Sequence, residues 1–287
     1  LAVESTGSLN AIAPILATDL KLNIAGANPF DTNASSIEAT IANGDFVVND
    51  TNTTAVTLKE INVSGNLDVT SLAALHTDDE INAGGSVAFN SAAGITTDDE
   101  INAGGAVTFT AANGIITDDE IHAGGALTFT SGSGGISIGD EMTAGGAASL
   151  TANGGGSIID ASGGTGSYRV VAHDINLLTD GGNIGTASRA FRTQGAVLNV
   201  NTNGTGNVWL RNTNTASSGT VALQYAPVGS LNFTEDNTTS HNNGKLLVNG
   251  SIVSNGEIFV TSNEKSLEVG SGASLTTQDG NITLQNT

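Results

Sequence analysis

One block of sequence is repeated along the middle of the chain, and this repetition constrains the fold more than any other feature. Residues 76–85 return as residues 96–105 and again as residues 116–125, and a shortened form follows at residues 139–146. The glutamates of the four copies stand at positions 80, 100, 120 and 141, so the step is 20, 20 and then 21 residues. A fixed period in this range indicates a solenoid of stacked repeats.

Each block predicts three short strands separated by three corners. In residues 106–110 apolar and polar side chains alternate, which places Val107 and Phe109 on one face of a strand. Residues 115–117 and 121–123 predict two further strands, divided by the acidic corner at residues 118–120 and ended by a pair of glycines. No segment between the glycines is long enough for a helix. The sequence therefore predicts an all-β fold, a parallel β-helix with about 20 residues per coil.

The aligned positions predict four inward ladders, in which each coil contributes one rung. A single coil cannot bury its apolar face, whereas stacked coils about 4.8 Å apart bury a continuous core. The four predicted ladders are Phe89, Phe109, Phe129 and Leu150; Val87, Val107, Leu127 and Ala148; Ile81, Ile101, Ile121 and Met142; and Leu75, Ile95, Ile115 and Ile136.

The domain organisation predicted from these patterns is one continuous β-helix over residues 1–287. Residues 1–71 form irregular coils, residues 72–150 the regular repeats, and residues 151–287 irregular and then regular coils. At about 20 residues per coil, the length predicts about 14 coils and a rod on the order of 65 Å. The chain starts at Leu1 with neither methionine nor signal peptide, so we expect a segment excised from a longer protein.

The charge of the chain excludes several classes of partner. There are 28 acidic residues against 8 lysines and arginines, which gives a formal net charge of −20. Without a basic patch, binding to nucleic-acid phosphates or to an anionic membrane surface is not expected. No run is apolar enough to span a bilayer, and the absence of cysteine excludes disulfides and thiol chemistry.

The acidic corners are the candidate metal site. Stacking would bring their carboxylates into columns about 5 Å apart, where each pair repels by roughly 1 kcal/mol in water. A Ca²⁺ ion, which prefers hard oxygen ligands, would turn this repulsion into attraction. The alternative is a solvated acidic stripe without a bound ion. The candidate Ca²⁺ ligands are Asp78, Asp79, Glu80, Asp98, Asp99, Glu100, Asp118, Asp119 and Glu120.

The remaining motifs predict no catalytic residue. Residues 135–139 match the Gly-x-Ser-x-Gly pattern of hydrolases, but Ser137 aligns with strand positions and the required strand–turn–helix elbow is absent. The histidines have no metal-ligand spacing along the sequence, so we expect them to be solvated or to fill coils. The threonine columns suit outward strand positions better than an ice-binding face.

Polysaccharide lyases and hydrolases also use β-helices, which leaves an enzyme as an alternative. The residues that would then act are Arg169, Asp174, Asp180, Arg189 and Arg192. An enzyme needs a cleft built from irregular loops, and most of this chain has short corners. We therefore expect surface salt bridges at these positions and no enzymatic activity.

Two stretches resemble the repeat regions of large bacterial surface adhesins of the filamentous haemagglutinin type. One is residues 101–111, Ile-Asn-Ala-Gly-Gly-Ala-Val-Thr-Phe-Thr-Ala. The other is residues 182–188, followed by Phe191, Thr193 and residues 197–199. The resemblance covers roughly residues 75–210 and the rest loosely.

The resemblance implies a right-handed β-helical fibre that is secreted or displayed on a bacterial surface. It further implies a non-enzymatic role in attachment, with other cells or surface glycans and proteins as partners. We expect a monomeric rod. The alternatives are a β-helix that binds or cleaves polysaccharides and a purely structural stalk.

Overall fold

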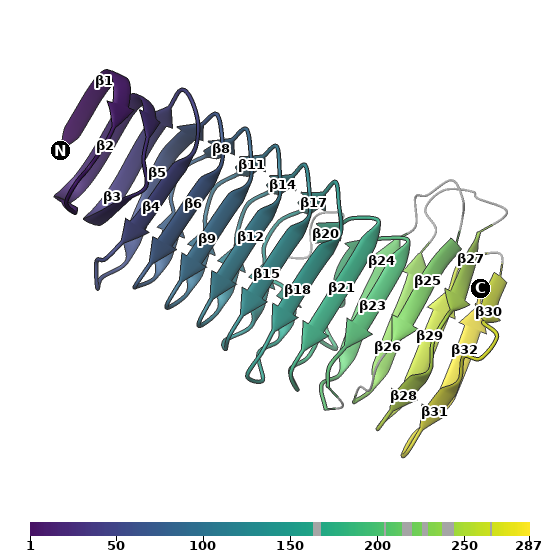
Figure 1. The fold of residues 1–287 in the computed structure, drawn as a ribbon. Coiled ribbons are helices and arrows are strands. Elements are labelled where there is room, and N and C mark those ends of the chain that lie inside the picture. The colour runs from purple at the N-terminus through teal and green to yellow at the C-terminus, as the bar shows by residue number, and fades with distance from the viewer. Residues whose placement is uncertain (163–167, 204, 214–219, 226–228, 237–243, 265) are drawn as a thin grey trace.

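The chain folds into a parallel β-solenoid. The computed structural model describes residues 1–162, 168–203, 205–213, 220–225, 229–236, 244–264 and 266–287. Within these residues there is no helix, and parallel strands stack into about 12 turns of roughly 21 residues each (Figure 1). The predicted fold class is confirmed. The predicted number of coils, about 14, is too high, because coils outside the regular repeats contain longer strands and longer connections than 20 residues allow.

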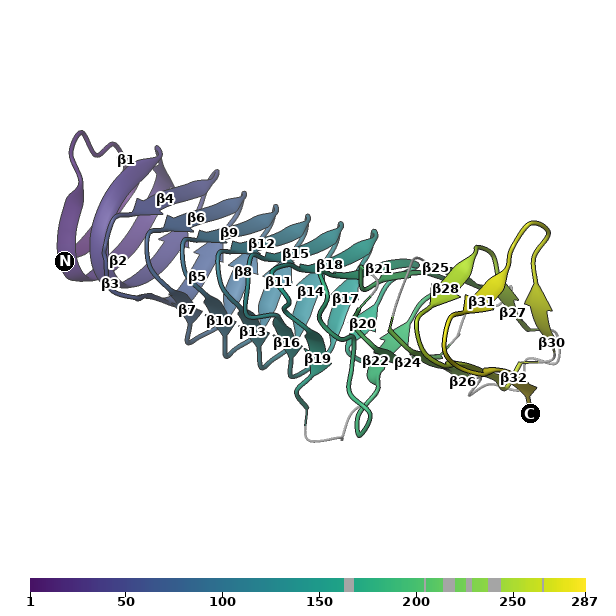
Figure 2. The same cartoon turned by 90° about the horizontal axis from the view of Figure 1, so that it is seen from below.

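Each regular coil contributes one strand to each of three faces, which are visible in Figures 1 and 2. The first face consists of β4 (Phe46–Asp50), β6 (Leu67–Ser71), β9 (Val87–Ser91), β12 (Val107–Ala111), β15 (Leu127–Ser131), β18 (Ala148–Ala152), β21 (Asp174–Thr179), β23 (Val197–Asn201), β25 (Thr220–Tyr225), β27 (Lys245–Val248) and β30 (Ser266–Val269).

The other two faces are built from shorter strands. The second face contains β7 (Leu75–Thr77), β10 (Ile95–Thr97), β13 (Ile115–Thr117), β16 (Ile136–Ile138) and β19 (Ile158–Asp160). The third face contains β8 (Ile81–Ala83), β11 (Ile101–Ala103), β14 (Ile121–Ala123), β17 (Met142–Ala144), β20 (Val170–Val171) and β22 (Phe191–Gln194).

Longer strands replace this three-strand plan at the N-terminal end of the solenoid, whereas the third face continues from β22 to the C-terminal end. The N-terminal coils contain β1 (Ala2–Leu9), β2 (Ile15–Ala27), β3 (Phe30–Ile41) and β5 (Val56–Val63). The C-terminal coils contain β24 (Val208–Thr213), β26 (Leu231–Asp236), β29 (Ile258–Ser262) and β32 (Ile282–Asn286), while β28 (Ile252–Ser254) and β31 (Leu275–Thr277) pair separately.

The acidic corners divide one long strand into two short ones. Strand β5 is continuous, yet its first residues pair with β7 and its last residues pair with β8. In the next coil, Asp78, Asp79 and Glu80 stand between β7 and β8. The corner is turned by a local hydrogen bond, in which the Glu80 backbone N–H donates to Asp79 Oδ1 at 2.9 Å. Aspartate favours such a turn because its side chain bonds the adjacent backbone.

The four predicted ladders form the core. Phe89, Phe109 and Phe129 pair in register on the first face, and the ladder continues to Leu150. Their rings stack: the centroids of Phe89 and Phe109 are 5.0 Å apart, and those of Phe109 and Phe129 are 4.5 Å apart. The ladders of Val87, Ile81 and Leu75 also pair as predicted. Every member of the four ladders is buried.

The first glycine of each Gly-Gly pair is required by the close approach of successive coils. A Cβ atom at Gly104 would lie 2.3 Å from the Gly84 carbonyl oxygen, and one at Gly124 would meet Gly104 at the same distance. A side chain cannot occupy this space without separating the coils. The repeated glycines therefore serve coil packing.

One inward column of the core is polar. Thr77, Thr97 and Thr117 pair in register on the second face, and all three are fully buried, so the outward position predicted for this threonine column is wrong. In the described part of the chain, none of their hydroxyl groups finds a hydrogen-bond partner. The column continues through Ile138 to Asp160, so an aliphatic side chain also fits there.

Candidate functional site

The acidic corners stack along one edge of the solenoid, between the second and third faces. The strands on either side keep a strict register from coil to coil, so equivalent acids occupy equivalent places. The first aspartate of each corner, at positions 78, 98 and 118, is exposed. This arrangement is the acidic column that the sequence predicted.

Much of the carboxylate surface in these corners already has a partner within the protein. The second aspartates, Asp79, Asp99 and Asp119, each accept the backbone N–H of the following glutamate. Asp78 accepts a hydrogen bond from Lys59 within an ion pair, and this hydrogen bond lowers the pKa of Asp78. The nine predicted Ca²⁺ ligands therefore do not act as one uniform ladder, and Ca²⁺ binding at them stays a prediction.

Two mixed clusters of one imidazole and two carboxylates arise where histidines meet this column. In the first, His76 Nε2 lies 2.7 Å from Asp98 Oδ2, with Asp78 beside them. In the second, His122 Nε2 lies 3.4 Å from Glu100 Oε1 and 3.2 Å from Glu120 Oε2. Among the described residues, these are the two groups whose ligand atoms lie close enough to hold a metal ion.

No local sequence motif reveals these clusters, because their members come from successive coils. Glu100 and His122 are 22 residues apart, which matches no local ligand motif. The repeat period nevertheless contains the information: position 122 lies one coil step of 20 residues after Asn102, and it is a histidine. A histidine two residues after an acidic corner therefore faces the corner of the preceding coil.

The two clusters differ in their surroundings. Lys59 supplies a positive charge to the His76 cluster through Asp78. No lysine or arginine forms an ion pair with Glu100 or Glu120 in the described chain. Burial, and then the Glu120 carboxylate, raise the pKa of the next glutamate, Glu141. Negative charge is therefore concentrated around His122.

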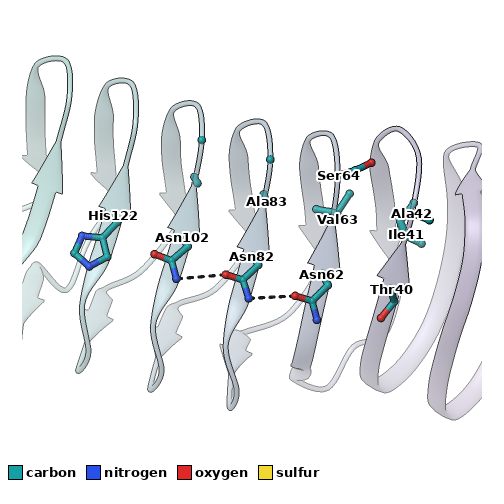
Figure 3. Close-up of a pocket in the computed structure, with 13 residues that line it drawn as sticks. Thr40, Ile41, Ala42, Asn62, Val63, Ser64, Asn82, Ala83, Asn102 and His122 are labelled. Carbon is teal, nitrogen blue, oxygen red and sulfur yellow. Dashed lines mark hydrogen bonds between the residues drawn. The ribbon is translucent and has the colours of Figure 1, made fainter.

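A row of amides lies on the third face beside this column. Asn82 donates to Asn62 Oδ1 at 3.1 Å, and Asn102 donates to Asn82 Oδ1 at 3.3 Å (Figure 3). His122 occupies the next position along this line, on the following coil, and the amide row ends there. Together with Thr40 and the adjacent Ala and Gly residues, the row lines an open groove with a volume of about 520 Å³. Its side chains offer hydrogen-bond donors and acceptors at each coil step.

Arg169, Arg189 and Arg192 form a largely interior, structural network rather than the surface salt bridges that the sequence predicts. Arg169 is 1% exposed and donates to the Gly139 carbonyl oxygen, while Arg192 Nε donates to Asp160 Oδ2 at 2.8 Å. Arg192 also donates to Ser162 Oγ at 2.8 Å, and Arg189 donates to the Ser162 carbonyl oxygen. Burial lowers the pKa of Arg169, and Asp160 opposes this effect.

The predicted grouping of these arginines with Asp174 and Asp180 is wrong. Asp174 contacts His173, and Asp180 accepts a hydrogen bond from Asn203. The acid that the sequence analysis missed is Asp160, which continues the inward threonine column and meets the arginines from inside the solenoid. The irregular coil lengths in this region concealed that alignment.

The Gly-x-Ser-x-Gly motif and the remaining histidines do not form a further site in the described residues. Ser137 lies in β16, paired with Ile116, and no helix follows it in the described residues. His173 is paired with Asp174, and His241 lies outside the described residues. No segment in the described parts of the chain is a helix long and apolar enough to cross a membrane.

No protein-family model, curated protein or solved structure matches this chain. The functional argument therefore depends on the fold and on the surfaces just described.

Proposed function

We propose that this chain is a non-enzymatic segment of a large bacterial adhesin of the filamentous haemagglutinin type, displayed on the cell surface or secreted. Its role is to provide a stiff fibre. The fibre extends from the cell and supports attachment to other cells or to surface glycans and proteins. The segment acts as a monomeric rod.

The continuous core is the observation that carries this proposal. From Leu20 to Val260 the described coils bury an unbroken series of apolar residues, and each coil is hydrogen-bonded to the next. Bending or shearing such a rod would break ladder hydrogen bonds and expose apolar side chains, both of which cost free energy. With about 12 turns at roughly 4.8 Å each, the rod spans on the order of 55 Å.

The surface chemistry is consistent with a fibre exposed to water. The net charge of −20 keeps the surface hydrated and disfavours self-association. The chain contains no cysteine that oxidation outside the cell would cross-link.

A second candidate function, polysaccharide binding, is favoured by the groove of Figure 3. The amide row of Asn62, Asn82 and Asn102 presents the same hydrogen-bonding group at each coil. An extended sugar polymer also repeats its hydroxyl groups at regular intervals, so one chain would engage several rungs at once. Because glutamates flank the row, a neutral polymer suits it better than an acidic one.

The decisive experiment incubates the protein with a panel of neutral and acidic cell-surface polysaccharides, with and without Ca²⁺. Retained protein and released oligosaccharide are both measured. The matched control is a variant in which Asn82 and Asn102 are replaced by alanine, since both side chains lie on the outer surface of the third face.

Retention without cleavage supports a binding adhesin, and loss of retention in the double variant assigns the binding to the groove. Retention only with Ca²⁺ supports a role for the acidic corners, and calorimetry without heat at millimolar Ca²⁺ excludes one. Release of oligosaccharide would overturn the non-enzymatic proposal. Absence of retention across the panel would leave a structural stalk.

A further inference from the structure

His122 differs from the other members of its ladder in what it offers to the acidic column. The equivalent residues in the two preceding coils are Asn82 and Asn102, whose amides bond to each other. An imidazole at this place ends the amide row and directs a ring nitrogen at Glu100 and Glu120.

The orientation of the His122 ring is set by a residue outside the cluster. His122 Nδ1 lies 2.8 Å from Thr143 Oγ1 on the following coil. When Nδ1 carries the ring hydrogen and donates it to this hydroxyl, the lone pair of Nε2 points toward the carboxylates. Histidines that ligate metals are held in the same manner, by a hydrogen bond from the second ring nitrogen.

Three acceptor atoms then converge without a hydrogen atom between them. Nε2 of His122 and one oxygen each of Glu100 and Glu120 all lie within 4.8 Å of one another. In this tautomer the three lone pairs repel one another, and a metal ion bound by all three atoms would turn that repulsion into attraction. No lysine or arginine provides an ion pair to these two glutamates in the described chain.

The distances fit a small divalent metal ion. With Zn²⁺–ligand bonds of about 2.0–2.1 Å, two ligand atoms of a tetrahedral site lie about 3.3 Å apart. The observed separations from Nε2 are 3.4 Å to Glu100 and 3.2 Å to Glu120. The two carboxylate oxygens lie within 4.8 Å of each other, and a small rotation of either side chain would bring them to the same spacing.

We propose that Glu100, Glu120 and His122 form a binding site for a divalent transition-metal ion, with Zn²⁺ as the reference ion. The imidazole nitrogen ligand favours a transition-metal ion over Ca²⁺, because Ca²⁺ takes oxygen ligands. Because the ligands come from two successive coils, the ion joins those coils across the acidic column. This site is independent of the proposed adhesive function.

The test is calorimetric titration of the intact chain with Zn²⁺ and, separately, with Ca²⁺. The site is removed by His122→Asn, which installs the residue that the ladder already carries at positions 82 and 102. The matched control is His76→Thr, which installs the residue of the next rung, Thr96, in the cluster that Lys59 already neutralises. Far-UV circular dichroism confirms that both variants fold.

The expected result is saturable binding of Zn²⁺ at one site in the wild-type chain and in His76→Thr, and loss of that site in His122→Asn. Thr143→Val should weaken binding by about 10–100-fold, as changes to residues that orient metal ligands do. Co²⁺ bound at the site should give the visible absorption of tetrahedral nitrogen and oxygen coordination. Retention of full Zn²⁺ affinity in His122→Asn, absence of saturable binding, or equal binding of Ca²⁺ would overturn the proposal.

Discussion

The aromatic ladder gives the sharpest test of how the solenoid is stabilised. Phe109 is fully buried, and its ring stacks on both Phe89 and Phe129, at centroid distances of 5.0 and 4.5 Å. Replacing Phe109 with alanine removes the ring from the middle of this stack. The hydrogen-bonded coils on either side cannot move into the space, because their spacing is fixed by backbone bonds between the strands.

The expected loss is large. Phenylalanine-to-alanine changes in cores cost about 3–5 kcal/mol, and the cost rises where the surroundings cannot collapse. Each lost ring contact adds about 0.5–1.5 kcal/mol to the burial of area. We therefore expect Phe109→Ala to lie near the upper end of the range, about 4–5 kcal/mol.

The assay must resolve single coils, because a repeat array does not always unfold in one step. Hydrogen exchange of the backbone amides in β9, β12 and β15 measures the local opening free energy, and a denaturant melt followed by circular dichroism measures the global change. Thr110→Ala is the matched control, since Thr110 is the exposed neighbour of Phe109 on the same strand. A loss below about 1 kcal/mol for Phe109→Ala, or an equal loss for Thr110→Ala, would refute the assignment of ladder and outer face.

Three further substitutions probe the polar interior. Thr97→Val should stabilise the chain by about 1–3 kcal/mol in a denaturant melt, because it removes a buried hydroxyl without a partner; a loss of stability would indicate a hydrogen-bonded internal water. Asp50 is buried and only one of its oxygens has a partner, and burial raises its pKa above the ordinary 3.8. The protonated form is therefore favoured in the folded state, so the contribution of Asp50 to stability falls as the pH rises from about 3.8 through the raised pKa. Asp50→Asn should remove this pH dependence and be more stable than wild type at neutral pH. If the stabilities of wild type and Asp50→Asn changed in parallel between about pH 3 and pH 8, the argument would be contradicted. Asp160→Asn should cost about 3–5 kcal/mol, because it leaves the buried Arg169 and its neighbour Arg192 without their carboxylate. Thermal melts of Asp160→Asn and of the half-exposed control Asp174→Asn provide the comparison.

The regular part of the fold could be predicted because its signals are local and repeated. Alternation along a strand assigns Val107 and Phe109 to the core, and the step of 20 residues then assigns the same role to their equivalents. A shift by one residue would expose every ladder at once, so the register has one stable solution. The Asp-Asp-Glu segments are corners for an equally local reason, since each second aspartate bonds the next backbone N–H.

The irregular coils could not be predicted to the same depth. Ile138 pairs with Asp160 rather than with Ile158, the residue 20 positions along, and this longer step hides the alignment of Asp160 with the threonine column. Without a known register, the sequence does not distinguish Asp160 from Asp174 or Asp180 as the partner of the arginines. The structure instead places Asp160 among them, within the solenoid.

By itself, the sequence determined the fold class, the four apolar ladders and the acidic column, because each follows from a short pattern and its period. Only the tertiary structure decided which polar side chains meet between coils: His122 with Glu100, the asparagines of the amide row with one another, and Arg192 with Asp160. Those contacts join residues of successive coils, and they depend on how each corner turns and on how each side chain is oriented. A period predicts which rungs are neighbours, whereas only the geometry of the stacked coils brings particular atoms into contact.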